Sequence, residues 1–272
     1  MTTTDGNGTA ADFIEVGEGG EARRIALALQ PPAPGNALAH FVWLSGYRSD
    51  MSGTKAVELA GLAARLGTAC VRFDYSGHGA SGGAFTDGTI SRWLEEALAV
   101  IDHAANVLDS RRLVLVGSSM GGWIALRAVA ALAARKDIEV AGLVLIAPAP
   151  DFTSELIEPN LTEAERTALA ERGRFEEPTP YGPEPNIYTL KLIEDGRQNR
   201  VLDGVIETGC PVHILQGMAD PDVPYAHAVR LMEHLSGDDV VLTMIRDGDH
   251  RLSRPQDIAK ILEAAEAFAR GQ

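Results

Sequence analysis

The chain has 272 residues, of which 45% are hydrophobic and 23% are charged, and this composition excludes a disordered chain as the overall class. It carries 24 Lys and Arg against 38 Asp and Glu, which gives a formal net charge of −14. Nucleic acid and anionic membrane surfaces repel a chain of that charge, so the sequence predicts neither as a partner.

Targeting and membrane segments are not expected. Residues 1–12 are polar and contain no basic stretch followed by an apolar one, so we expect no signal peptide and a cytoplasmic protein. The most apolar stretch, residues 113–134, is interrupted by glycines and serines and carries Arg127, which is typical of a buried strand and helix. Cys70 and Cys210 lack metal-ligand spacing, and we expect both to be buried and reduced.

Short β-rich runs alternate with longer helical patterns along most of the chain. The predicted strands are residues 13–16, 24–29, 41–44, 69–73, 113–116, 143–146, 212–215 and 240–245. The predicted helices are residues 54–66, 90–108, 120–134, 225–235 and 255–270. Strand and helix take turns from the third strand onward, which predicts an α/β fold with a mostly parallel eight-stranded sheet flanked by helices. The first two strands have no helix between them and are predicted to form an antiparallel edge.

One segment, residues 151–209, interrupts this alternation and shows no convincing strand. It contains a helix signal that begins with a capping box, in which Thr162 is followed three residues later by Glu165. A second helical pattern lies around residues 189–195. The segment is too short for a core of its own, so we predict one α/β domain over residues 1–272 with a cap or lid insertion at 151–209.

The strongest functional signal is the run Gly117-Ser118-Ser119-Met120-Gly121, which has the pattern G-x-S-x-G. It directly follows an apolar strand pattern and directly precedes a helical one. In such a turn the central serine takes a strained conformation, and glycines two residues on either side avoid collisions with it. The motif predicts Ser119 as a nucleophile at the positive end of the following helix, while Ser118 points elsewhere.

A serine nucleophile requires a base, and His250 is the best candidate because it follows the last predicted strand. A turn at that place projects toward the carboxyl edge of the sheet, where the nucleophile turn also lies. His227, His234 and His103 fall inside helical patterns and are predicted to lie on the surface, and His40 precedes a strand.

The acid that orients the base is expected between the serine and the histidine in the chain. Asp220 fits because it follows a predicted strand and precedes a helix that starts after Pro224. Asp222, two residues further on, is a competing candidate. Asp151 leaves the preceding core strand and begins the insertion, so it is expected to cap or anchor the insertion instead.

Acyl transfer also needs hydrogen-bond donors for the negative charge that develops on the carbonyl oxygen. The backbone N–H groups of Met120 and Tyr47 are predicted to supply this oxyanion hole. Four aromatic residues either line an apolar, substrate-binding acyl pocket or form a small core of the insertion. They are Phe152, Phe175, Tyr181 and Tyr188. No metal-ligand cluster or phosphate-binding glycine loop occurs in the sequence, so no metal and no organic cofactor is expected.

The nucleophile turn, the Asp220 loop and His250 together resemble the α/β-hydrolase superfamily. Residues 74–82 (DYSGHGASG) are similar to the D-x-x-G-x-G-x-S turn of that fold, and the resemblance implies a structural loop around His78. Five segments resemble a narrower family more closely, namely residues 44–55 (LSGYRSDMSGTK), 70–76 (CVRFDYS), 116–123 (VGSSMGGW), 217–224 and 249–251. This is the palmitoyl-protein thioesterase family, also named mycophenolic acid acyl-glucuronide esterase, with its bacterial relatives. The resemblance implies Ser119 as nucleophile, Asp220 as acid and His250 as base.

The sequence therefore predicts a serine hydrolase that cleaves a small-molecule carboxylic ester or thioester through an acyl-enzyme. One alternative is carbon–carbon bond hydrolysis by the same triad on a dienoic ketone acid. Arg48 and Arg251 lie near the predicted site, but the acidic chain offers no clear basic cluster for such a carboxylate. The other alternative is a non-catalytic ligand receptor on a hydrolase scaffold, and the intact serine, histidine and aspartate argue against it.

Overall fold

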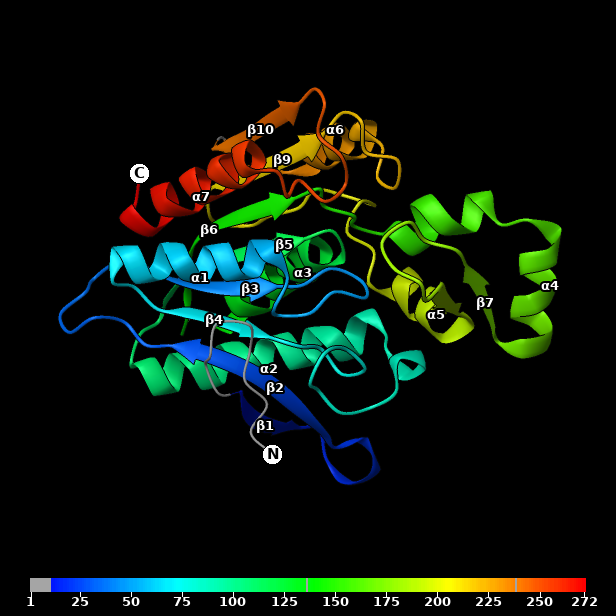
Figure 1. Ribbon diagram of the computed structural model, residues 1–272, viewed down its shortest axis with the longest axis horizontal. Coiled ribbons are helices and arrows are strands. Elements are labelled where there is room, and N and C mark those ends of the chain that lie inside the picture. The colour runs from blue at the N-terminus through cyan, green and yellow to red at the C-terminus, as the bar shows by residue number, and fades with distance from the viewer. Residues whose placement is uncertain (1–10, 136, 238) are drawn as a thin grey trace.

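Within the described residues, eight strands form one mixed sheet in the order β1-β2-β4-β3-β5-β6-β9-β10 (Figure 1). They are β1 (Asp12–Val16), β2 (Arg23–Gln30), β3 (His40–Leu44), β4 (Cys70–Phe73), β5 (Arg112–Ser118), β6 (Glu139–Ile146), β9 (Val212–Gly217) and β10 (Val240–Ile245). The computed structural model describes residues 11–135, 137–237 and 239–272. β2 pairs antiparallel with β1 and β4, and the other pairs are parallel. The predicted α/β fold with its antiparallel edge is confirmed.

Helices cover both faces of this sheet. α1 (Thr54–Leu66) and α7 (Pro255–Arg270) pack on one face, and α2 (Ile90–Leu108), α3 (Met120–Arg135) and α6 (Tyr225–His234) pack on the other. Side chains alternate between the two cores along each strand. In β5, Leu113 and Leu115 join the core with α2 and α3, whereas Val114 and Val116 join the core with α1 and α7. Strands buried on both faces have continuous apolar runs, which explains why the sequence reveals them.

The structure bears on the predictions about membrane segments and cysteines. In the described ranges, none of the helices combines the length and the apolar character that a membrane crossing requires. Cys70 is a free thiol buried in β4, and burial raises the pKa of that thiol to about 12. Cys210 is also free but only partly buried, contrary to the prediction, because it lies in the irregular segment that leads into β9.

Residues 151–209 extend beyond the carboxyl ends of the parallel strands, and the arrowheads of β6 and β9 point toward them in Figure 1. The elements of this insertion are η3 (Thr153–Ile157), η4 (Glu158–Asn160), α4 (Glu163–Arg172), β7 (Arg174–Glu177), β8 (Asn186–Thr189) and α5 (Leu190–Gln198). The predicted capping box is present at the start of α4, with reciprocal hydrogen bonds between Thr162 and Glu165.

The prediction that the insertion contains no strand is wrong, because β7 and β8 form an antiparallel pair. In β7 only Phe175 is buried, and its other residues are charged and exposed. A strand of four residues is too short for an alternating pattern to be noticed in the sequence. The pair is stabilised by Phe175 and Tyr188, which lie opposite each other with ring centroids 5.2 Å apart.

A buried carboxylate joins the two ends of the insertion. Asp151 is fully buried, and its oxygens accept the N–H groups of Val201 at 2.9 Å and of Leu202 at 2.8 Å. The segment that follows β6 is therefore bound to the segment that precedes β9, and Asp151 anchors the insertion as the sequence suggests.

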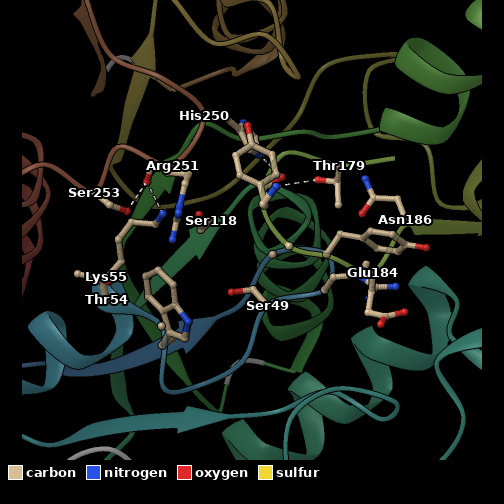
Figure 2. A pocket seen from close by; sticks show the side chains of 18 of the residues that line it. Ser49, Thr54, Lys55, Ser118, Thr179, Glu184, Asn186, His250, Arg251 and Ser253 are labelled. Carbon is tan, nitrogen blue, oxygen red and sulfur yellow. Dashed lines mark hydrogen bonds between the residues drawn. The ribbon is translucent and has the colours of Figure 1, made fainter. Parts of the chain in front are cut away.

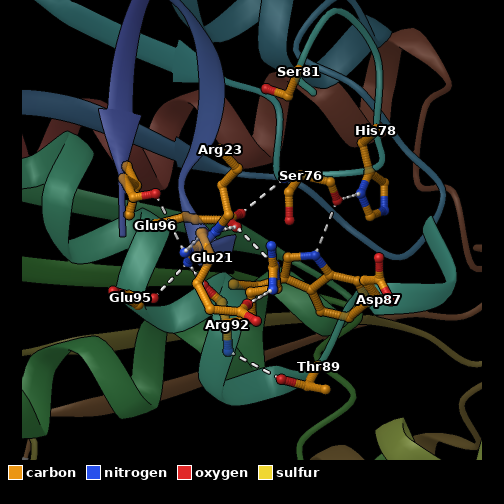
Figure 3. A network of polar contacts seen from close by, with 12 residues as sticks. Glu21, Arg23, Ser76, His78, Ser81, Asp87, Thr89, Arg92, Glu95 and Glu96 are labelled. Atoms are coloured by element: carbon orange, nitrogen blue, oxygen red, sulfur yellow. Dashed lines mark hydrogen bonds and ion pairs between the residues drawn. The ribbon is translucent and has the colours of Figure 1, made fainter. Parts of the chain in front are cut away.

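A buried ion pair attaches the edge hairpin to the rest of the fold (Figure 3). Arg23 on β2 donates to Glu96 on α2, with 2.5 Å between Nε and Oε1, and Glu96 is fully buried. Arg23 also donates to the more exposed Glu95. The second oxygen of Glu96 accepts the N–H of Ser76 at 2.8 Å, so one carboxylate connects β2, α2 and the loop after β4.

Arg23→Met is expected to lower the free energy of unfolding by about 3–5 kcal/mol, because it removes the nearest cation from the buried Glu96 charge and leaves it only the N–H of Ser76 and the more distant Arg92 at 3.9 Å. The double variant Arg23→Met/Glu96→Gln removes that charge and keeps a carbonyl acceptor for Ser76, so it should recover part of the loss. Urea unfolding followed by circular dichroism measures both. A single variant as stable as the wild type would contradict the prediction.

Candidate active site

The turn between β5 and α3 brings Ser119 to the carboxyl edge of the sheet. Ser119 has a φ angle of +54°, in the left-handed region that residues with a side chain rarely adopt. Its N–H donates to the carbonyl of Ile146 at 2.9 Å, which fixes the turn against the end of β6. A β-carbon at Gly121 would lie 2.0 Å from the carbonyl oxygen of Leu44, so only glycine permits this packing. This is the geometry of a nucleophile elbow.

Side chains from three separate loops form a hydrogen-bonded chain at this edge. Nε2 of His250 lies 3.1 Å from Oγ of Ser119, and Nδ1 of His250 lies 2.8 Å from Oδ2 of Asp220. The His250 loop is held against the end of β9, because the N–H of Ala219 donates to the carbonyl of Gly248 at 2.9 Å. The structure thus brings together the three residues that the sequence predicts as nucleophile, base and acid.

The carboxylate of Asp220 is buried and has several donors. Oδ1 accepts the N–H groups of Asp222 and Val223, both at 2.9 Å, and Oδ2 accepts the side-chain amide of Gln216 at 3.1 Å as well as His250. Burial acts to raise the pKa of Asp220, but the hydrogen bond and charge of His250 and the two N–H groups outweigh it, and the pKa lies below its usual value. Asp220 is therefore ionised at neutral pH and able to stabilise an imidazolium.

The two competing aspartates have other partners. Asp222 is exposed, and its carboxylate accepts the hydroxyl of Tyr181. The carboxylate of Asp151 is engaged by the backbone at the other end of the insertion. In the part of the chain that the structure describes, neither is hydrogen bonded to His250, and Asp220 occupies the position of the orienting acid.

Three other histidines are buried in structural contacts. His78 accepts the N–H of Arg48 at 3.2 Å, and burial lowers the pKa of its imidazole to about 4. His40, in the first position of β3, lies 2.8 Å from the hydroxyl of Thr68. His227 is predicted to lie on the surface, and that prediction is wrong. Its Nε2 donates to the carbonyl of Pro150 at 2.8 Å, because the start of the insertion covers the first turn of α6.

The loop after β3 contacts the nucleophile turn directly. A β-carbon at Gly46 would lie 3.3 Å from the β-carbon of Ser119, so the peptide that carries the N–H of Tyr47 is adjacent to the nucleophile. Met120 is the first residue of α3, and its N–H is one of the free N–H groups at the helix start. Among the hydrogen bonds of the described residues, neither N–H is donated to another group, so both fit the predicted oxyanion role.

Two cavities open on Ser119 and His250. The cavity that we call apolar has a volume of about 460 Å³, and its apolar lining includes Met120, Ala149, Phe152, Leu156, Ile157, Tyr188 and Val223. The carboxylates of Glu177 and Asp222 also line it. The basic cavity has a volume of about 390 Å³, and its charged lining consists of Arg48, Lys55, Arg251 and Glu184. Figure 2 shows the basic cavity with Lys55 and Arg251 on one side and Thr179 and Asn186 of the insertion on the other.

Three of the four predicted substrate-binding aromatic residues face these cavities. Phe152 and Tyr188 line the apolar cavity, and Tyr181 lines both. Phe175 lines neither, and this corrects its assignment. It packs behind Tyr188 and borders a separate depression beside α4, because β7 is the outer strand of the pair. Phe175 therefore has the second of the two predicted roles, as part of the small core of the insertion.

The basic cavity contains a lysine whose role the sequence does not reveal. Lys55 lies in the first turn of α1, and its Nζ donates to the carbonyl of Arg251, the residue after His250. Burial lowers the pKa of Lys55 to about 8, and the nearby Arg251 contributes to the shift. Among the described residues, Lys55, Arg48 and Arg251 form no ion pair with a carboxylate. Lys55 ends the segment 44–55 that resembles the thioesterase family, but its position beside the His250 loop depends on a contact across 196 residues that no local pattern predicts.

Comparison with known proteins places the chain in a family. The model of the alpha/beta hydrolase family matches residues 33–261. The mitochondrial palmitoyl-protein thioesterase ABHD10 of Homo sapiens is 31% identical over 219 residues, which are 80% of this chain and 68% of that protein. Among solved structures, a putative hydrolase from Agrobacterium vitis S4 is 62% identical with a TM-score of 0.91, and the match covers 95% of this chain and 98% of that one.

Mouse alpha/beta hydrolase domain-containing protein 10 is 27% identical with a TM-score of 0.80, over 96% of this chain and 98% of the mouse chain. The family match thus extends over the sheet from β3 to β10, without the edge strands β1 and β2, and over the loops that carry Ser119, Asp220 and His250. The protein belongs to the alpha/beta hydrolase family.

Proposed function

We propose that the protein hydrolyses carboxylic esters or thioesters through an acyl-enzyme on Ser119. The observation that carries this proposal is the hydrogen-bonded chain from Ser119 through His250 to Asp220, which opens on two cavities whose charged side chains differ in sign. A relative named palmitoyl-protein thioesterase supports the same reaction class and an apolar acyl group.

In the first half of the reaction, Nε2 of His250 takes the proton from Oγ of Ser119 as this oxygen attacks the carbonyl carbon. The negative charge that forms on the carbonyl oxygen is stabilised by the N–H groups of Tyr47 and Met120. The imidazolium then gives its proton to the departing alcohol or thiol, and the acyl group stays on Ser119. In the second half, His250 activates water, which releases the acid and restores the serine.

The two cavities suggest where the two parts of the substrate lie. The apolar cavity offers burial for an acyl chain, which gains about 25 cal/mol for each Å² of apolar surface removed from water. The basic cavity is then the place of the leaving group. Residues 151–209 contribute to both cavities, so we propose that this insertion acts as the lid that selects the substrate.

The assignment of the triad leads to one set of substitutions. Ser119→Ala is expected to lose several orders of magnitude in turnover of 4-nitrophenyl acetate, and Asp220→Asn about 10⁴-fold, since each removes one link of the chain. Asp222→Asn and Asp151→Asn are the matched controls and should retain far more turnover. A dead Asp222→Asn beside an active Asp220→Asn, both folded by circular dichroism, would overturn the assignment.

The acyl position can be tested at Leu156, which lines the apolar cavity from the insertion. Leu156→Trp fills part of this cavity, so it should shorten the acyl chain that gives the highest kcat/KM, and Leu156→Ala should lengthen it. The profile is measured with 4-nitrophenyl esters of increasing chain length. Val229→Trp, on the exposed side of α6, controls for the added indole. If the dependence of kcat/KM on acyl-chain length is unchanged in both Leu156 variants, the acyl chain does not bind in this cavity.

The three cations of the basic cavity predict a preference for leaving groups with negative charge. An acyl thioester of N-acetylcysteine carries a carboxylate that the matched thioester of N-acetylcysteamine lacks. Its kcat/KM should be about five- to tenfold higher, since one such contact is worth on the order of 1 kcal/mol. Lys55→Met should reduce this ratio, whereas Lys260→Met on the outer side of α7 should not.

The same preference should depend on pH. The pKa of Lys55 is about 8, so its ammonium is charged below that pH and neutral above it. The ratio between the two thioesters is therefore expected to fall as the pH rises through 8 in the wild type and to stay flat in Lys55→Met. Equal rates for the two thioesters at pH 7 would exclude an anionic leaving group.

A further inference from the structure

The side chain of Tyr47 connects the loop after β3 to the insertion. Its hydroxyl donates to the carbonyl of Ile187 on β8, a residue 140 positions later in the chain. Its ring stacks on the ring of Tyr188, with centroids 5.5 Å apart and planes 8° from parallel. Burial raises the pKa of the Tyr47 hydroxyl well above its usual value, so the group remains a neutral donor across the working pH range.

The same ring contacts three further aromatic residues, two outside the insertion (Phe85 and Trp93) and one at its start (Phe152). The Tyr47 ring has its centroid 5.0 Å from that of Phe85, 5.9 Å from that of Trp93 and 5.9 Å from that of Phe152. Aromatic contacts of this kind contribute beyond the area that they bury. The ring is therefore wedged between the core and β8, and a movement of β8 is transmitted to Tyr47.

The backbone around Tyr47 has few other restraints. Arg48 has a φ angle of +56°, a left-handed conformation that costs on the order of 1 kcal/mol or more in a residue with a side chain. Its N–H donates to His78 at 3.2 Å, and the N–H of Ser49 donates to the carbonyl of Gly46 at 3.1 Å. A loop with so little regular hydrogen bonding depends on side-chain contacts to hold its shape.

We propose that Tyr47 is a positioning residue whose hydroxyl couples the insertion to the oxyanion hole. The coupling rests on the proposed function, because it acts through the backbone N–H of Tyr47 next to Ser119. When β8 is seated on the core, the hydrogen bond to Ile187 and the stack on Tyr188 hold this peptide in the orientation that a developing oxyanion requires. When β8 moves away, the donor is lost and turnover falls, so hydrolysis follows closure of the insertion.

The test compares two variants that each remove one attachment of the insertion. Tyr47→Phe keeps the ring and removes the hydrogen bond to β8. Arg230→Met removes the ion pair between α6 and Glu155 of η3, and it leaves the Tyr47 contact in place. A merely structural role of Tyr47 predicts similar effects of the two variants, whereas a positioning role predicts a loss of turnover confined to Tyr47→Phe.

With 4-nitrophenyl acetate, whose acyl group is too small to need the insertion, Tyr47→Phe should lower kcat about tenfold and leave KM unchanged. The inhibition constant of phenylboronic acid, whose adduct with Ser119 places an oxygen in the oxyanion hole, should rise by the same factor. Both quantities should stay within about twofold in Arg230→Met. Wild-type affinity for the boronic acid in Tyr47→Phe, or equal losses of kcat in both variants, would overturn the proposal.

Hydrogen exchange gives a readout that does not require turnover. Tyr47→Phe should increase exchange both in residues 45–49 and in β8, whereas Arg230→Met should increase it in η3 and leave residues 45–49 unchanged. Unchanged exchange in residues 45–49 of Tyr47→Phe would refute the coupling. A wild-type protein that neither hydrolyses esters nor binds the boronic acid would refute the proposed function instead, and the exchange experiment would still decide whether the coupling exists.

Discussion

The reacting groups depend on the contact between two loops that leave neighbouring parallel strands. β3 and β5 are paired up to Leu44 and Gly117, so the loop that follows β3 and the turn that carries Ser119 leave the sheet side by side. At Gly121 the two backbones are so close that a single β-carbon would collide with the carbonyl of Leu44. The loops of Asp220 and His250 and the insertion are arranged around this contact, because parallel strands direct all of them to one edge.

The sequence predicts features that have a local signature and misses those that do not. The strands of the large sheet can be recognised from their apolar residues. Ser119 is indicated by the G-x-S-x-G motif, and Asp220 and His250 are indicated by their positions directly after predicted strands. The contacts of Tyr47 with β8 and of Lys55 with the His250 loop join segments 140 and 196 residues apart, and only the folded chain brings them together. The β7–β8 pair is missed for another reason, since its stability comes from side-chain packing between very short strands.

The distribution of charge differs between the whole chain and the active-site region. The chain carries a formal charge of −14, yet three cations and one acid line the basic cavity beside Ser119. At physiological ionic strength charges more than about 8 Å away are strongly screened, so a group inside this cavity experiences mainly the nearby cations. The overall charge slows the approach of an anion, and the local charge stabilises it after it has entered.

The anchoring of the insertion by Asp151 bears on how this fold can diversify. One carboxylate holds the chain at residue 151 and again 50 residues later, so it closes this part of the insertion into a loop. The entropy of closing a loop grows only with the logarithm of its length, about 0.6 kcal/mol for each doubling. Changes in the length of the segment therefore cost little in closure entropy, and they are tolerated where they keep its contacts with the core, such as those of Leu192 and Ile193. New substrate preferences can then evolve without rebuilding the sheet.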